Sequence, residues 1–131
     1  MSASKRKSQK TSERERFLAS FVNAGNGVQA ALAREFNVRV FAVVTVAVIA
    51  AGWALGISLT EWMVLIIVIG LNFVAELFNT ALEVLCDRVT RKSDAEIRAV
   101  KDISAAAVLI FAVTAAFTGG IIFLPRIIAL F

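Results

Sequence analysis

This sequence has little of the chemistry on which most soluble enzymes rely. Its 131 residues include no His, no Tyr, one Cys and one Pro. A single cysteine excludes an intrachain disulfide, and the lack of His excludes the common zinc and iron sites. Any bound metal must therefore be a hard cation held by oxygen ligands.

Charge is missing from three long stretches. The chain is 59% hydrophobic with a mean hydropathy of +0.79, and residues 40–60, 62–75 and 103–125 carry no charged side chain. A helix needs roughly 20 residues to cross the bilayer core. We therefore predict an all-α integral membrane protein with three transmembrane helices, at about residues 38–58, 61–87 and 101–124.

The N-terminal part is polar. Residues 1–12 are rich in Lys, Arg and Ser and predict a disordered basic tail that is not a signal peptide. Residues 13–34 show an apolar stripe at helical spacing, which predicts an amphipathic helix in the membrane surface. The stripe consists of Phe17, Phe21, Ala24, Val28 and Leu32. Residues 13–131 are expected to form one domain.

The basic residues are distributed unevenly. Eight of the 14 Lys and Arg precede the first span, five lie between the second and third, and one follows the third. The positive-inside rule then predicts a cytoplasmic N-terminus and an outside C-terminus in the cell membrane. Span one contains Gly52 and Gly56, a GxxxG pattern that indicates close helix packing. In the loop that follows, Thr60 is a candidate helix N-cap.

The second span ends in a polar face. Asn72, Glu76, Asn79, Glu83 and Asp87 fall within an arc of roughly 80° on a helix. Packing contacts with neighbouring helices would account for the presence of one Asn in the span, but they account poorly for the presence of two Glu side chains on one face. Because carboxylates repel each other in low dielectric, a proton or a cation is expected between them. This face predicts an active site.

Two flanking groups have alternative interpretations. Glu35 either pairs with Arg39 at i, i+4 or forms one wall of a cation site. Lys101 either binds a phosphate or forms a salt bridge with Asp87, and its spacing favours the salt bridge.

These residues resemble a known family. The segment Glu76-Leu-Phe-Asn79-Thr-Ala-Leu-Glu83, with Asp87, resembles the ExxNxxxE…D signature of the prokaryotic diacylglycerol kinase family. Lys101-Asp102 with the block at 104–109 is similar to its KD-x-AAGAVL block, although Ala106 replaces the usual Gly. Asn23, Gly27, Glu35, Asn37 and Arg39 match its N-terminal helix. Residues 57–62 are more similar to the undecaprenol kinase branch.

The resemblance implies a homotrimeric lipid kinase that uses MgATP, with sites shared between subunits. By the match of motifs, Glu76 is the expected catalytic base, and Glu35 and Glu83 are the expected magnesium ligands, which also contact the nucleotide. Asn79 and Asp87 are expected to support them. The further ATP-binding positions implied are Arg16, Asn23, Lys92, Asp94, Lys101 and Asp102.

Several alternatives remain open at this level. The lipid acceptor is either undecaprenol, which we favour, or diacylglycerol. From another class, Glu76 could carry protons in a small coupled transporter, or the three spans could form a pore. We expect a lipid and ATP as partners, and no nucleic acid.

Overall fold

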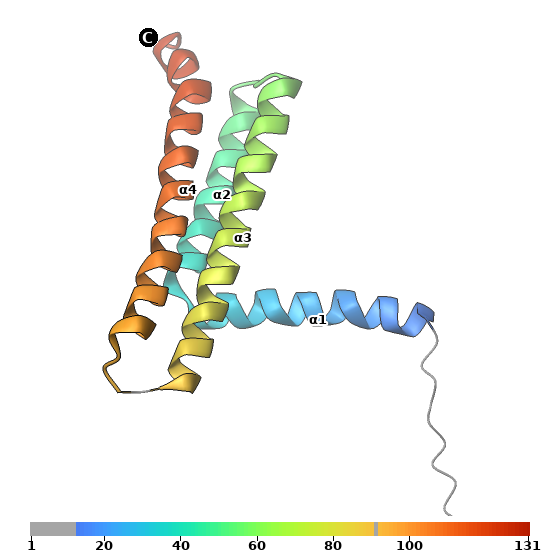
Figure 1. Cartoon of the computed structure of the whole chain (residues 1–131). Coiled ribbons are helices and arrows are strands. Elements are labelled where there is room, and N and C mark those ends of the chain that lie inside the picture. Colours follow the sequence, from blue (N-terminus) through green and yellow to red (C-terminus); the bar gives the residue numbers. More distant parts are fainter. Residues whose placement is uncertain (1–12, 91) are drawn as a thin grey trace, which may run out of the picture.

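The computed structural model describes residues 13–90 and 92–131, so the predicted tail at 1–12 lies outside the described residues. Four helices follow one another: α1 (Glu13–Arg34), α2 (Phe36–Ala54), α3 (Leu59–Val89) and α4 (Ala95–Ile128). Helices α2, α3 and α4 form an elongated bundle, and α1 leaves its lower part almost at a right angle (Figure 1). The all-α architecture is confirmed.

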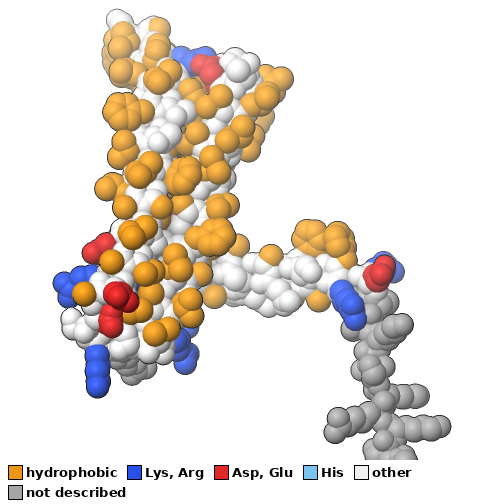
Figure 2. Space-filling view, in the orientation of Figure 1, with side chains coloured by type: hydrophobic (Ala, Val, Ile, Leu, Met, Phe, Trp, Pro, Cys, Tyr) orange, Lys and Arg blue, Asp and Glu red, His pale blue; other side chains and the backbone are white. Residues whose placement is uncertain are grey.

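The bundle has the dimensions of a membrane domain. Helices α2, α3 and α4 are each long and apolar enough to cross a membrane. The 31 residues of α3 and the 34 of α4 span ~46 and ~51 Å at 1.5 Å per residue, which exceeds the ~30 Å hydrocarbon core. Charged side chains gather near the ends of the bundle, and hydrophobic ones cover its middle (Figure 2). The chain is therefore a multi-pass membrane protein in which α3 and α4 extend beyond the apolar layer.

Capping side chains determine where the helices begin. The N-cap of α3 is Ser58, not Thr60 as predicted: its Oγ accepts a hydrogen bond from the Glu61 backbone N–H, and the Glu61 carboxylate accepts one from the Ser58 N–H at 2.7 Å. Asp94 caps α4 by accepting from the N–H groups of Glu96 and Ile97. As a result, α4 begins about two turns before Lys101, and Lys101 lies in the helix just before the uncharged segment 103–125.

The GxxxG interpretation of Gly52 and Gly56 is wrong, because α2 ends between them. Gly56 has a φ of 61°, a left-handed conformation that glycine adopts readily, and the Ile57 N–H donates back to the Gly52 carbonyl. Gly52 packs inside its own chain, where a Cβ would lie 2.8 Å from the Trp62 ring. Gly56 therefore shapes the α2–α3 turn, and Gly52 allows the close approach of the Trp62 ring of α3.

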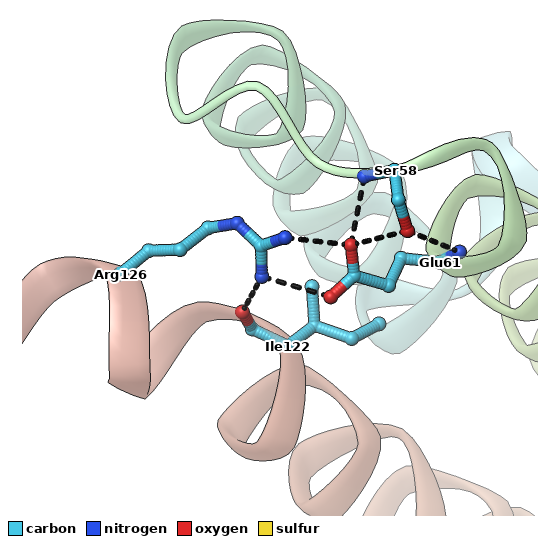
Figure 3. A network of polar contacts seen from close by, with 4 residues as sticks. All are labelled: Ser58, Glu61, Ile122 and Arg126. Atoms are coloured by element: carbon cyan, nitrogen blue, oxygen red, sulfur yellow. Dashed lines mark hydrogen bonds and ion pairs between the residues drawn. The ribbon is translucent and has the colours of Figure 1, made fainter.

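An ion pair joins α3 and α4 at the end of the bundle opposite α1 (Figure 3). The Arg126 guanidinium donates to both oxygens of Glu61, at 2.8 and 2.7 Å, and also to the Ile122 carbonyl. Ser58 donates its N–H and hydroxyl to the same carboxylate. Below this network lies the buried apolar cluster of Ile57, Leu65 and Ile122. Sequence reasoning did not identify this pair, because its members are 65 residues apart.

We predict that Arg126→Gln lowers the melting temperature of the detergent-solubilised protein by a few degrees, because the half-buried Glu61 loses its bidentate partner. Arg98→Gln, at an exposed position of α4, is the control. Adding Glu61→Gln to Arg126→Gln should recover part of the loss. A melting temperature equal to that of the control would show that the pair does not stabilise the bundle.

Candidate functional site

The polar face of α3 changes from buried to exposed along the helix. Asn72 and Glu76 are only 2% and 7% exposed, Glu83 is half-buried, and Asp87 is exposed. Counting about 20 residues from Glu61 places the inner edge of the apolar layer near residue 80. Glu76 therefore lies just inside this edge, and Glu83 just beyond it.

Asn72 has a structural role at the deep end of this face. Its Nδ2 donates to the Phe111 carbonyl of α4 at 3.2 Å and to the Val68 carbonyl of its own helix at 3.3 Å. Such bonds between membrane helices stabilise packing because water is not available as a partner. For this residue, the interpretation as a packing contact is sufficient.

Asn79 connects α4 to Glu83. The Ser104 hydroxyl donates to Asn79 Oδ1 at 2.6 Å, and Asn79 Nδ2 donates to Glu83 Oε1 at 3.3 Å. This arrangement orients the amide and restricts the Glu83 carboxylate. Ser104 was not among the expected site residues. Its only sequence signal was its place at the start of a run of alanines.

Lys101 forms the salt bridge that its spacing favoured. Its Nζ lies 2.6 Å from Asp87 Oδ1, and Glu83 is close enough to affect Lys101 electrostatically. Because the ion pair is solvent-exposed, it stabilises the fold only weakly. The ammonium can therefore exchange this partner for a phosphate at little energetic cost.

Glu76 is a buried carboxylate without a partner. Within residues 13–90 and 92–131 no hydrogen bond or ion pair reaches it, and the nearby carboxylates of Glu35 and Glu83 both repel it. Three carboxylates from α3 and the α1–α2 junction thus lie near the inner edge of the apolar layer, close enough to interact electrostatically. The arrangement favours binding of a proton or a cation.

Glu35 reaches this cluster because it lies at the break between two helices. Its backbone is extended, with φ −101° and ψ 124°. The predicted pair with Arg39 is not formed. Arg39 instead donates to the carbonyls of Leu32 and Ala33 at the end of α1, where free carbonyls attract cations. The Glu35 carboxylate therefore remains available to the site.

Other expected ATP contacts do not join this cluster within one chain. Arg16 and Asn23 lie on the projecting part of α1, about 27 and 17 Å of helix rise from its end at Arg34. Lys92 is exposed in the α3–α4 turn, Asp94 caps α4, and Asp102 is exposed beside Lys101.

The available donors suit a hard cation. In the described part of the chain, there is no place where three or more Asp, Glu or Cys side chains lie close enough together to bind one metal ion. Magnesium typically takes only one or two protein carboxylates and completes its shell with water and substrate phosphates. Glu35 and Glu83, both carboxylates near the aqueous edge, fit that requirement.

Comparison with known proteins identifies the class. The chain belongs to the prokaryotic diacylglycerol kinase family, whose model matches residues 22–123. It is thus a lipid kinase, a phosphotransferase. This result argues against the transporter and pore interpretations.

Two relatives carry specific names. The chain is 39% identical over 115 residues to the undecaprenol kinase of Bacillus subtilis (strain 168), covering 88% of this chain and 94% of that protein. It is 37% identical over 114 residues to the diacylglycerol kinase of Synechocystis sp. (strain ATCC 27184 / PCC 6803 / Kazusa), covering 86% of this chain and 65% of that protein.

Proposed function

We propose that the chain transfers the γ-phosphate of ATP to the hydroxyl of undecaprenol, and that Glu76 is the general base. The lipid oxygen attacks the γ-phosphorus, the bond from that phosphorus to the β-bridging oxygen breaks, and ADP leaves. Glu76 takes the hydroxyl proton and later releases it to water. The products are undecaprenyl phosphate, ADP and a proton.

The observation that carries this proposal is the unpartnered Glu76 carboxylate just inside the apolar layer. A lipid alcohol presents its hydroxyl at that depth. A base without a hydrogen-bond partner of its own can accept the proton of that hydroxyl. Glu83 lies about 10 Å of helix rise closer to the aqueous edge, so the same face offers carboxylates to a nucleotide arriving from water.

The remaining residues have complementary roles in this proposal. Glu35 and Glu83 would hold magnesium together with the nucleotide, and magnesium would neutralise phosphate charge. Asn79 and Ser104 orient Glu83. Lys101 would turn from Asp87 toward the nucleotide phosphates, with Asp102 beside it. Lys92 and Asp94 in the α3–α4 turn are further candidate ATP contacts.

The position of α1 supports a shared site. The part of α1 that carries Arg16 and Asn23 projects away from the bundle (Figure 1), so these residues would contact ATP bound to another copy. We therefore propose a homotrimer in which α1 reaches a neighbouring bundle. The basic residues before α2 and between α3 and α4 support a cytoplasmic N-terminus and an outside C-terminus in the bacterial membrane.

The relatives favour undecaprenol as the acceptor, because the undecaprenol kinase is matched over 94% of its length and the diacylglycerol kinase over 65%. The test is transfer of labelled phosphate from ATP by the purified protein in mixed micelles, with undecaprenol and diacylglycerol offered in parallel. Preferential labelling of undecaprenol is expected. Preferential labelling of diacylglycerol would contradict the acceptor assignment.

Glu76→Gln should reduce turnover by about 100-fold or more while nucleotide binding is retained, because an amide cannot accept the proton. Nucleotide binding can be followed by fluorescence of a labelled ATP analogue. Glu96→Gln, in the exposed first turn of α4, is the matched control. Normal turnover in Glu76→Gln would refute the role as base.

Glu83→Gln should raise the magnesium concentration that gives half-maximal activity, because one anionic ligand is lost. The measurement is a magnesium titration at fixed ATP, with Glu96→Gln again as the control. If both variants titrate alike, Glu83 does not bind the metal.

A further inference from the structure

A buried hydroxyl joins α4 to the carboxylate face of α3. Ser104 is 8% exposed, and its Oγ lies 2.6 Å from Asn79 Oδ1 and 2.9 Å from the Lys101 carbonyl oxygen of its own helix. Both neighbours are acceptors, so the single hydroxyl proton can be donated to only one of them at a time. The shorter distance favours Asn79, and that hydrogen bond crosses from one helix to the other.

The contact with Ser104 determines which way the Asn79 amide points. Because the hydroxyl donates to Oδ1, the Nδ2 group lies on the other side of the amide, where it donates to Glu83 Oε1 at 3.3 Å. The bond from Nδ2 to Glu83 is long and therefore weak by itself. The orientation of the Glu83 carboxylate thus depends on Ser104 through one intervening side chain.

A second polar contact between the same two helices is exchangeable. Lys101 lies one turn before Ser104 on α4, and its ion pair with Asp87 is exposed to solvent. In the proposed function, Lys101 leaves Asp87 for the nucleotide phosphates. The buried bond between Ser104 and Asn79 then still joins α4 to α3 beside Glu83, because water competes poorly for buried partners.

We propose that Ser104 is a positioning residue for nucleotide binding. Through Asn79 it orients Glu83 toward magnesium, and by joining α4 to α3 it keeps Lys101 within reach of the same nucleotide. The inference rests on the proposed function, in which Glu83 holds magnesium and Lys101 meets phosphate. This role requires no contact between Ser104 and the nucleotide.

The position of Ser104 in the sequence makes the proposal testable. In the KD-x-AAGAVL block of the family, the residue three positions after Lys is Ala, whereas this chain has Ser. Alanine at this position is therefore compatible with the fold, and Ser104→Ala removes the hydroxyl while the helix contact is retained. A role in packing alone would lower the melting temperature of this variant and leave its magnesium requirement unchanged.

The test measures how nucleotide binding by the full chain in detergent micelles depends on magnesium, by fluorescence of a labelled ATP analogue. Ser104→Ala should raise the magnesium concentration for half-maximal binding about threefold, because Glu83 loses part of its orientation. Thr114→Val is the matched control. Its hydroxyl also lies on α4, but it donates to the Ile110 carbonyl of its own helix.

A double-mutant cycle tests the route through Asn79. Asn79→Ala should raise the same magnesium concentration at least as much as Ser104→Ala, because it removes the amide that contacts Glu83. In the Asn79→Ala background, Ser104→Ala should have no further effect, because the hydroxyl has no amide to orient. Effects of the two substitutions that multiply would contradict this route.

Equal magnesium concentrations for Ser104→Ala and Thr114→Val would overturn the positioning role, even if Ser104→Ala melts at a lower temperature. Because nucleotide binding is measured without lipid, this result does not depend on the identity of the acceptor. Absence of phosphate transfer to undecaprenol by the unmodified chain would instead count against the proposed function. The two failures are therefore distinguishable.

Discussion

The structure depends on how α3 carries carboxylates into an apolar layer. A charged group in low dielectric is unfavourable unless a proton, a cation or polar partners compensate it. Here the compensation differs along the helix. Asn72 is satisfied by the Phe111 carbonyl, Glu83 receives the amide of Asn79, and Asp87 pairs with Lys101. Glu76 alone on this face has no such partner in the described chain. The uncompensated position coincides with the depth at which a lipid hydroxyl would lie.

The two ends of the bundle use polar contacts for different purposes. At one end, Arg126, Glu61 and Ser58 form a hydrogen-bonded network that connects α3 with α4. At the other end, the exposed pair of Lys101 and Asp87 can exchange partners. The apolar cluster around Leu65 lies near the end with the Arg126 network. The buried cluster and the ion pair hold α3 against α4 at that end, and the exposed polar side chains at the other end are accessible to ligands from water.

The projecting surface helix links the proposed site to its environment. Because α1 leaves the bundle, its far part is available to another copy, while its near part and α3 line a common groove. The break at Glu35 sets this angle and places a carboxylate near Glu76. One short connection therefore serves the site and the proposed assembly.

Hydrophobic run length, helical periodicity and charge placement were sufficient to predict the three membrane helices, the surface helix at 13–34 and the polar face of α3, because each is a local property of the sequence. The motifs were sufficient to identify the family.

Tertiary structure decided the contacts between distant residues. These are the contacts of Arg126 with Glu61, of Ser104 with Asn79, and of Arg39 with the end of α1 in place of Glu35. It also decided that α2 ends before Gly56. Such pairings depend on how helices pack and turn, and helical spacing within one segment carries no information about the segment beside it.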